Sequence, residues 1–134
     1  MKQPEPNPDS GKKILILDDD DFLRDMLEKM IERFGYTPVV AETAEQAVEH
    51  CRRSVESGHP FDVALLDVMC PDETDGLEAA RTLKTISSDM PLIAMSGFSI
   101  APVHEYPQRY GYIKTLKKPF TLEELRTALT TVFQ

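Results

Sequence analysis

The sequence has few of the features that are typical of secreted proteins, of proteins stabilised by a structural metal, or of membrane proteins. It has only two cysteines, Cys51 and Cys70, without the spacing of a metal site, and its three histidines are too scattered to form one. No apolar stretch approaches the ~18 residues of a membrane span, and residues 1–13 lack the hydrophobic core of a signal peptide. These absences favour a protein of the reducing cytoplasm.

Positive charge is also scarce. The chain has 15 basic and 23 acidic residues, which gives a formal net charge of −8 at pH 7. This balance argues against binding to DNA or to an anionic membrane surface through bulk electrostatics. We therefore expect protein partners, with no direct nucleic-acid contact and no membrane insertion.

The length of 134 residues suits one domain that buries a core without disulfides or a structural metal. Residues 1–11 contain three prolines and almost nothing apolar. Such a composition predicts a disordered arm or linker. The folded domain is expected to cover residues 12–134.

Short apolar runs alternate with segments of helical spacing. The runs expected to form strands are residues 14–17, 37–40, 63–66, 91–95 and 112–116. Strands that alternate with helices over this length predict an α/β fold, in which helices cover both faces of a mainly parallel sheet through right-handed crossovers.

The helices are predicted from apolar spacing and from their end signals. Residues 22–34 form the clearest one, followed by Gly35 as a stop. Capping boxes, Thr43 with Gln46 and Thr121 with Glu124, open the second and the last helix. Another helix, residues 77–86, is expected after a loop that reaches Gly76. The apolar residues expected to face the core include Phe22, Met26, Met30, Phe34, Val55 and Leu122.

Polar side chains follow four of the apolar runs directly. Four aspartates, residues 18–21, follow the first run, and Asp67, Ser96 and the sequence Lys117-Lys118-Pro119 follow three later ones. Because ligands of such sheets bind outside the carboxyl ends of the strands, where strand order reverses, we expect these groups at one edge.

Adjacent carboxylates repel one another, and a divalent cation is the obvious compensation. An acidic run before a helix is also typical of a solvated helix cap, which the helix dipole favours. Asp20 and Asp21 are predicted to serve as that cap.

The motifs ILILDDDD, LLDVMCPDETDG, AMSG and KKPF resemble, in this order, those of the receiver domain of two-component response regulators. The separations of 49 (18 to 67), 29 (67 to 96) and 22 (96 to 118) are similar to those of the family. The resemblance covers residues 12–134. It implies a three-layer, doubly wound, flavodoxin-like sheet of five parallel strands in the order 2-1-3-4-5, which is also that of a chemotaxis regulator.

The resemblance also implies a function. Such a domain takes a phosphoryl group from a histidine kinase or a histidine phosphotransfer protein and signals by conformational change, catalysing only its own phosphorylation and slow dephosphorylation. By position, Asp67 would be the phosphoacceptor that forms an acyl phosphate. Lys118 would supply a movable cation, and the Ser96 hydroxyl would donate to a phosphoryl oxygen.

The same resemblance implies a magnesium site. Asp18, Asp19 and Asp67, with the backbone carbonyl of Met69, would offer the oxygen ligands that Mg²⁺ prefers. The loop that follows, residues 71–76, is one residue longer than is usual in the family.

Two further departures concern the switch region. Pro102 and Pro107 fall where the fourth helix of the family lies, and an interior proline removes a hydrogen bond, so this helix is predicted to be short or broken. Thr115 stands where the family commonly has a switching Tyr or Phe, and Tyr110 or Tyr112 are alternative aromatics.

Other functions compete with this one. A haloacid-dehalogenase-like phosphohydrolase would use Asp18-Asp19-Asp20 as its nucleophile motif with Mg²⁺, but the chain is short and that hypothesis leaves Asp67 without a role. A phosphate-independent interaction module is the third possibility, against which stands the retention of every acid and of the lysine. The sequence fits both a free single-domain regulator and a segment of a hybrid kinase.

Overall fold

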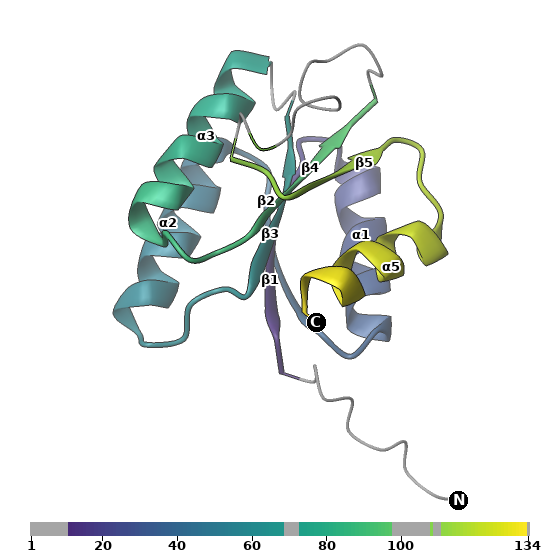
Figure 1. Cartoon of the computed structure of the whole chain (residues 1–134), viewed down its shortest axis with the longest axis horizontal. Helices are drawn as coiled ribbons and strands as arrows, with labels where there is room; N and C mark the ends of the chain where they lie inside the picture. The colour runs from purple at the N-terminus through teal and green to yellow at the C-terminus, as the bar shows by residue number, and fades with distance from the viewer. Residues whose placement is uncertain (1–10, 69–72, 98–107, 109–110, 134) are drawn as a thin grey trace, which may run out of the picture.

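The computed structural model describes residues 11–68, 73–97, 108 and 111–133 (Figure 1). Within them it has five strands and four helices. These are β1 (Lys13–Leu17), α1 (Asp21–Arg33), β2 (Thr37–Ala41), α2 (Ala44–Glu56), β3 (Val63–Asp67), α3 (Glu73–Ile86), β4 (Leu92–Ser96), β5 (Lys114–Lys117) and α5 (Leu122–Val132).

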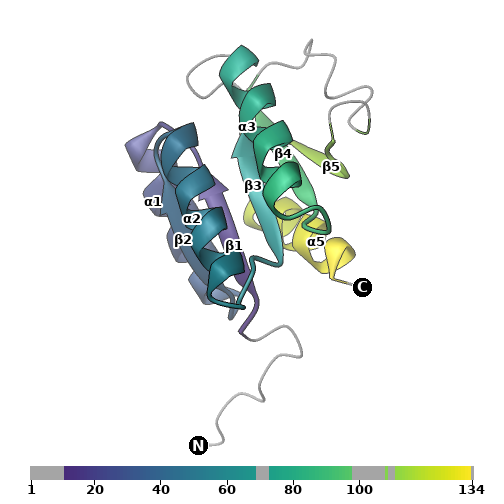
Figure 2. The same ribbon diagram turned by 90° about the vertical axis from the view of Figure 1, so that its left-hand side faces the viewer.

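The strands form one parallel sheet of order β2-β1-β3-β4-β5. Figures 1 and 2 show the sheet between two helical layers, with α1 and α5 on one face and α2 and α3 on the other. The predicted three-layer, doubly wound, flavodoxin-like fold is therefore confirmed, including its strand order.

The two faces of the sheet explain why the strands read as continuous apolar runs. Every residue of β3 and of β4 is buried. In β1, Ile14 and Ile16 pack with α1 and α5, whereas Leu15 and Leu17 pack on the opposite side with α2 and α3. Parallel strands covered on both faces need apolar side chains at successive positions.

The helix starts follow local hydrogen bonding. Asp20 caps α1, and its carboxylate accepts from the Leu23 N–H at 3.1 Å. Thr121 and Glu124 form the predicted reciprocal capping box of α5. The Thr43 hydroxyl caps α2 as predicted, but Gln46 accepts from the N–H of Glu42, one residue before the cap. The hydrogen bond from Leu23 to Asp20 therefore confirms the cap that the sequence predicted at the start of α1.

The prediction for the third helix was wrong at its start. α3 begins at Glu73 instead of residue 77, so Gly76 lies within the helix. A glycine costs a helix about 1 kcal/mol relative to alanine. That is too little to stop a helix whose later residues Ala79, Ala80 and Leu83 are buried against the sheet.

The predicted core was wrong on the flanks of three helices. Phe22 is 77% exposed, Met26 36%, and Val55 and Leu122 are each 40% exposed. In α1 the buried residues are Leu27 and Ile31. Phe22 and Met26 each lie one residue, about 100° around the helix axis, from Leu23 and Leu27, so they face the flank of α1.

Two sequence predictions fall on residues that the structure leaves out. The short or broken fourth helix is predicted within residues 100–110, of which only Gln108 is described, and the arm, residues 1–11, is described only at Gly11. Both remain predictions. In the described part of the chain, no helix combines the length and the apolar character needed to cross a membrane.

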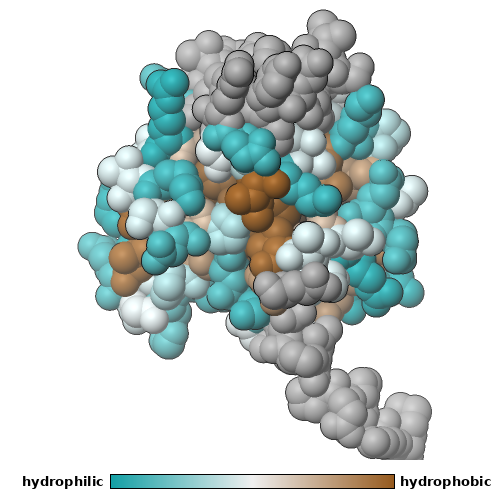
Figure 3. Space-filling model, in the orientation of Figure 1, coloured by the Kyte–Doolittle hydropathy of each residue, from teal (hydrophilic) through white to brown (hydrophobic). Residues whose placement is uncertain are grey.

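The β5 edge of the sheet is short and carries lysine at both ends, Lys114 and Lys117. Figure 3 shows apolar surface in the middle of this side of the molecule, over the β5 edge, with hydrophilic side chains around it. Ile113, which precedes β5, is 50% exposed. A short edge strand with charged ends is typical of proteins that avoid edge-to-edge pairing.

Candidate functional site

The polar residues predicted to meet at one edge of the sheet do so. Asp18 follows β1, Asp67 ends β3, Ser96 ends β4 and Lys118 follows β5. The parallel register pairs Leu17 with Leu66, Asp67 with Met95, and Ser96 with Lys117. All four groups therefore sit at the carboxyl edge, where the order of the sheet reverses around β1 and β3.

Lys118 joins two carboxylates at this edge. Its Nζ lies 2.8 Å from Oδ2 of Asp18 and 3.3 Å from Oδ2 of Asp67. The side chains of Asp18 and Asp67 are only 0% and 7% exposed, and that of Lys118 is 21% exposed. Burial lowers the pKa of Lys118, but the hydrogen bonds and charges of the two aspartates outweigh it and raise the pKa above its usual value. The ammonium thus remains charged at neutral pH.

Asp18 is held at each of its polar groups. Its N–H donates to the Ala41 carbonyl at 3.2 Å, and its own carbonyl accepts from Nη1 of Arg24 at 2.9 Å. Its Oδ1 accepts from the Asp20 N–H at 2.9 Å, while Oδ2 accepts from Lys118. These bonds fix both the main chain and the carboxylate of Asp18.

Three carboxylates form the acidic part of the site. Oxygen atoms of Asp18, Asp19 and Asp67 lie within 4.8 Å of one another, and Asp19 is exposed whereas the other two are buried. Such a set of hard oxygen donors fits a divalent cation. The Lys118 ammonium already contacts Asp18 and Asp67, so these carboxylates accommodate positive charge between them. The remaining ligand predicted from the sequence, the carbonyl of Met69, lies outside the described residues.

Ser96 is fully buried at the end of β4, and its carbonyl accepts from the backbone N–H of Lys118 at 2.8 Å. This bond fixes the segment that carries the ammonium beside the end of β4. Because Met95 pairs with Asp67 in the register, Ser96 stands one residue beyond the strand neighbour of Asp67.

The residues considered for the switch position differ in their surroundings. Thr115 lies half-buried in β5. Tyr112 is 1% exposed, and its hydroxyl has no hydrogen-bond partner within the described part of the chain. Burial and the negative charge of Asp67 raise the pKa of Tyr112. Tyr110 lies outside the described residues, so a replacement for the switching aromatic stays a prediction.

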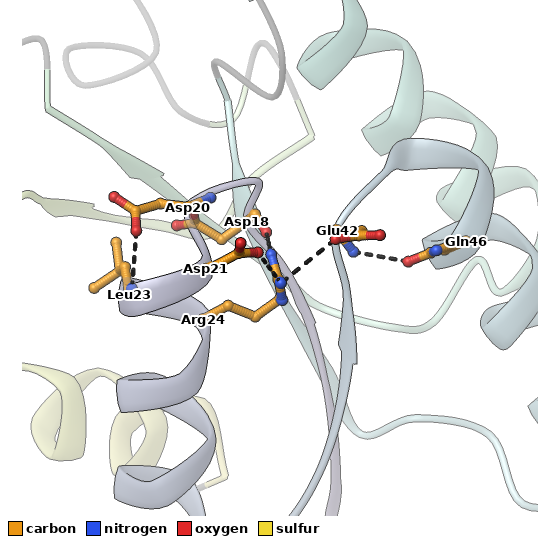
Figure 4. Close-up of polar contacts among 7 residues, drawn as sticks. All are labelled: Asp18, Asp20, Asp21, Leu23, Arg24, Glu42 and Gln46. Atoms are coloured by element: carbon orange, nitrogen blue, oxygen red, sulfur yellow. Dashed lines mark hydrogen bonds and ion pairs between the residues drawn. The ribbon is translucent and has the colours of Figure 1, made fainter.

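Two neighbours of the acidic cluster, Arg24 and Glu42, were not predicted from the sequence. Arg24 contacts Asp21 as well as Asp18, and its Nη2 lies 3.5 Å from Oε2 of Glu42 (Figure 4). The spacing of Asp21 and Arg24, three residues apart on a helix, was a usable signal. Glu42 gave none, because it approaches Arg24 only through the pairing of β1 with β2.

An apolar surface beside the site was not predicted from the sequence either. Phe22, Met26, Pro119 and Phe120, here called the α1 patch, line a depression of about 340 Å³ together with Asp20, Leu23 and Lys118. Helical spacing had assigned Phe22 and Met26 to the core, and their exposure is what reveals the surface.

Comparison with known proteins agrees with this arrangement. Residues 14–130 match the response regulator receiver domain family. The response regulator receiver protein CpdR of Brucella abortus is 31% identical over 114 residues, covering 85% of this chain and 90% of CpdR. Response regulator MprA of Mycobacterium ulcerans is 34% identical over 113 residues, covering 84% of this chain and 46% of MprA. The chain thus spans about half the length of MprA.

Solved structures show the same fold. The chemotaxis protein CheY4 of Vibrio cholerae superposes with a TM-score of 0.80 at 22% identity, over 92% of this chain and 99% of that one. The receiver domain of sensor histidine kinase PA1611 from Pseudomonas aeruginosa has a TM-score of 0.79 at 25% identity, over 93% of this chain and 100% of that one, and carries a magnesium ion in its active-site cleft. With the family match over most of its length, this chain belongs to the response regulator receiver domain family.

Proposed function

We propose that this chain is the phosphoacceptor of a two-component phosphorelay, and that Asp67 takes a phosphoryl group from a histidine kinase or a histidine phosphotransfer protein. The observation that carries this proposal is the ammonium of Lys118, held between Asp67 and Asp18 at the carboxyl edge. The protein would act in the cytoplasm, catalyse only its own phosphorylation and slow dephosphorylation, and signal to a protein partner by conformational change.

The transfer exchanges one bond for another. A carboxylate oxygen of Asp67 forms the new O–P bond, and the P–N bond to the donor histidine breaks, with its electron pair returning to the imidazole. Lys118 binds the negative charge that arrives with the phosphoryl group, from a position already 3.3 Å from Asp67. The Ser96 hydroxyl donates to a phosphoryl oxygen of the product.

The acidic cluster supports a cation site for the same step. Asp18, Asp19 and Asp67, with the Met69 carbonyl, would hold Mg²⁺, which supplies charge neutralisation on the phosphoryl oxygens. The carboxylate of Asp18 is already oriented without a cation, because it accepts hydrogen bonds from the Asp20 N–H and from Lys118.

The competing functions lose support for separate reasons. Membership in the receiver family removes the case for a haloacid-dehalogenase-like phosphohydrolase, which would leave the contact of Asp67 with Lys118 unexplained. A phosphate-independent interaction module would have no need of an ammonium between two buried carboxylates, because burying charge is unfavourable.

The direct test uses the wild-type chain with acetyl phosphate or a phosphorylated histidine kinase domain. Intact-mass measurement should show one added phosphoryl group when Mg²⁺ is present and much slower addition in EDTA. Absence of any addition from either donor would favour the interaction module.

The α1 patch supports a docking site for the protein donor. Phe22 is 77% exposed beside Asp20 and Lys118, and exposed aromatics of this kind mark protein contacts. The donor histidine must reach Asp67 at the adjoining edge, so the donor protein would cover this patch as it delivers the phosphoryl group.

Replacing Phe22 tests the docking site. Phe22→Ser should slow transfer from a phosphorylated kinase or phosphotransfer protein by about tenfold or more, because an aromatic anchor of a protein contact contributes on the order of 2 kcal/mol. Labelling by acetyl phosphate, which needs no docking, should stay unchanged. Stopped-flow or quench-flow transfer assays with both donors measure the two rates.

Val55→Ser is the matched control, since Val55 is 40% exposed near the end of α2. Its transfer rates should equal those of the wild type with either donor. Equal slowing of Phe22→Ser with acetyl phosphate and with the protein donor would contradict a docking role.

A further inference from the structure

Arg24 lies against the acidic cluster without belonging to it. Its side chain is 16% exposed, and its Nη1 donates to the carbonyl of Asp18 at 2.9 Å. Its Nη2 contacts the carboxylates of Asp21 and Glu42. Figure 4 shows the guanidinium between the start of α1 and the segment that follows β2.

The guanidinium therefore joins two connections of the fold. Asp18 belongs to the β1–α1 connection, and Glu42 belongs to the β2–α2 connection. Glu42 is fixed in turn, because its N–H donates to Oε1 of Gln46 in α2 at 2.9 Å. The Asp18 N–H donates to the Ala41 carbonyl, which closes the link between the two connections.

The charge of Arg24 is matched by the carboxylates of Asp21 and Glu42, but that charge does not help to bind a divalent ion. The guanidinium would repel a divalent ion bound by the nearby carboxylates, so its Coulomb interaction with that ion is unfavourable. A planar fork with several donors does suit the simultaneous contacts to a carbonyl and two carboxylates. The contacts of Arg24 thus indicate that it holds the surrounding main chain in place.

We propose that Arg24 is a positioning residue for the magnesium site, which holds the main chain at Asp18 and so aims the carboxylates of Asp18 and Asp19. It would act through the carbonyl of Asp18, to which its Nη1 donates at 2.9 Å. This inference rests on the proposed function, since the magnesium site is part of that proposal.

Two substitutions separate positioning from charge. Arg24→Lys keeps the positive charge but loses the planar set of N–H donors, whereas Arg24→Gln loses the charge and that set of donors. If Arg24 positions the ligands, both variants should bind Mg²⁺ roughly tenfold more weakly, as is typical when a residue that orients metal ligands is removed. If only its charge acts, Arg24→Lys should bind like the wild type and Arg24→Gln should bind more tightly. Isothermal titration calorimetry of the full chain measures the dissociation constants.

Amide hydrogen exchange in EDTA gives a second readout. The N–H groups of Asp18 and Asp20 donate to Ala41 and to Oδ1 of Asp18, respectively. In Arg24→Lys both should exchange faster than in the wild type, while buried amides of β3 should not change. A residue that only stabilised the whole fold would raise exchange in β3 as well.

Arg53→Gln is the matched control, because Arg53 is an exposed arginine of α2 that pairs with Glu49. It should bind Mg²⁺ like the wild type. Should Arg24→Gln fail to fold, Arg24→Lys alone decides: a dissociation constant within twofold of the wild type overturns the inference. A wild-type chain that binds no Mg²⁺ would overturn the proposed magnesium site itself, which is a distinguishable result.

Discussion

Asp67→Asn is expected to abolish stable phosphorylation of this chain by acetyl phosphate in the presence of Mg²⁺. The amide is nearly isosteric with the carboxylate but is no nucleophile, so no acyl phosphate forms. The variant should stay folded, because it removes only one of the two carboxylates that contact Lys118. Intact-mass analysis and Phos-tag electrophoresis measure the loss.

Two other aspartate variants serve as comparisons. Asp20→Asn should label like the wild type, because asparagine also caps helices well. Asp18→Asn should label more slowly and bind Mg²⁺ more weakly. Labelling of Asp67→Asn at the wild-type level would refute the assignment, and a phosphoryl group found on Asp18 would revive the phosphohydrolase alternative.

Lys118→Met should destabilise the protein in EDTA by about 3 kcal/mol, since removing one partner of a buried ion pair leaves unpaired buried charge. Asp18 and Asp67 would then face each other at the edge of the sheet without the ammonium. Added Mg²⁺ should recover much of the loss, because a ligand that binds only the folded state stabilises it. Urea denaturation in EDTA and in Mg²⁺ gives both values.

The distinctive result is the difference between the two conditions. Mg²⁺ should stabilise Lys118→Met more than the wild type, in which the ammonium already neutralises the carboxylates. Lys29→Met is the control, since Lys29 and Asp25 form an exposed pair that contributes at most about 0.5 kcal/mol. Equal stability of Lys118→Met and the wild type in EDTA would show that the ion pair is not needed for folding.

Much of the fold could be predicted because its signals are local. The apolar runs around Leu15, Leu65 and Ile93 are strands buried on both faces, and the residues that directly follow them reach the carboxyl edge whatever the strand order. That order is a different matter. Apolar periodicity does not say which strands pair, so the position of β1 between β2 and β3 came only from the family resemblance.

The failures have a physical pattern. Apolar spacing marks a helix but does not tell its core-facing stripe from its flank, which is why Phe22 and Met26 were assigned to the interior. The contact of Arg24 with Glu42 depends on the pairing of β1 with β2, and the sequence separates the two residues by 18 positions. Local pattern therefore found the groups proposed for the chemistry and missed those that support and surround them.

The two ends of the described fold meet at a cluster of rings. The Lys12 ammonium lies 5.3 Å from the ring centre of Phe133, and that ring packs edge-on against Tyr36. Because β1 starts here and ends at the acidic edge, the cluster lies roughly 16 Å from the site, five residues at about 3.3 Å each. A fluorophore or surface tether attached beside Phe133 would leave the acidic site accessible. This end of the molecule is therefore suited to the attachment of labels in a phosphorylation biosensor.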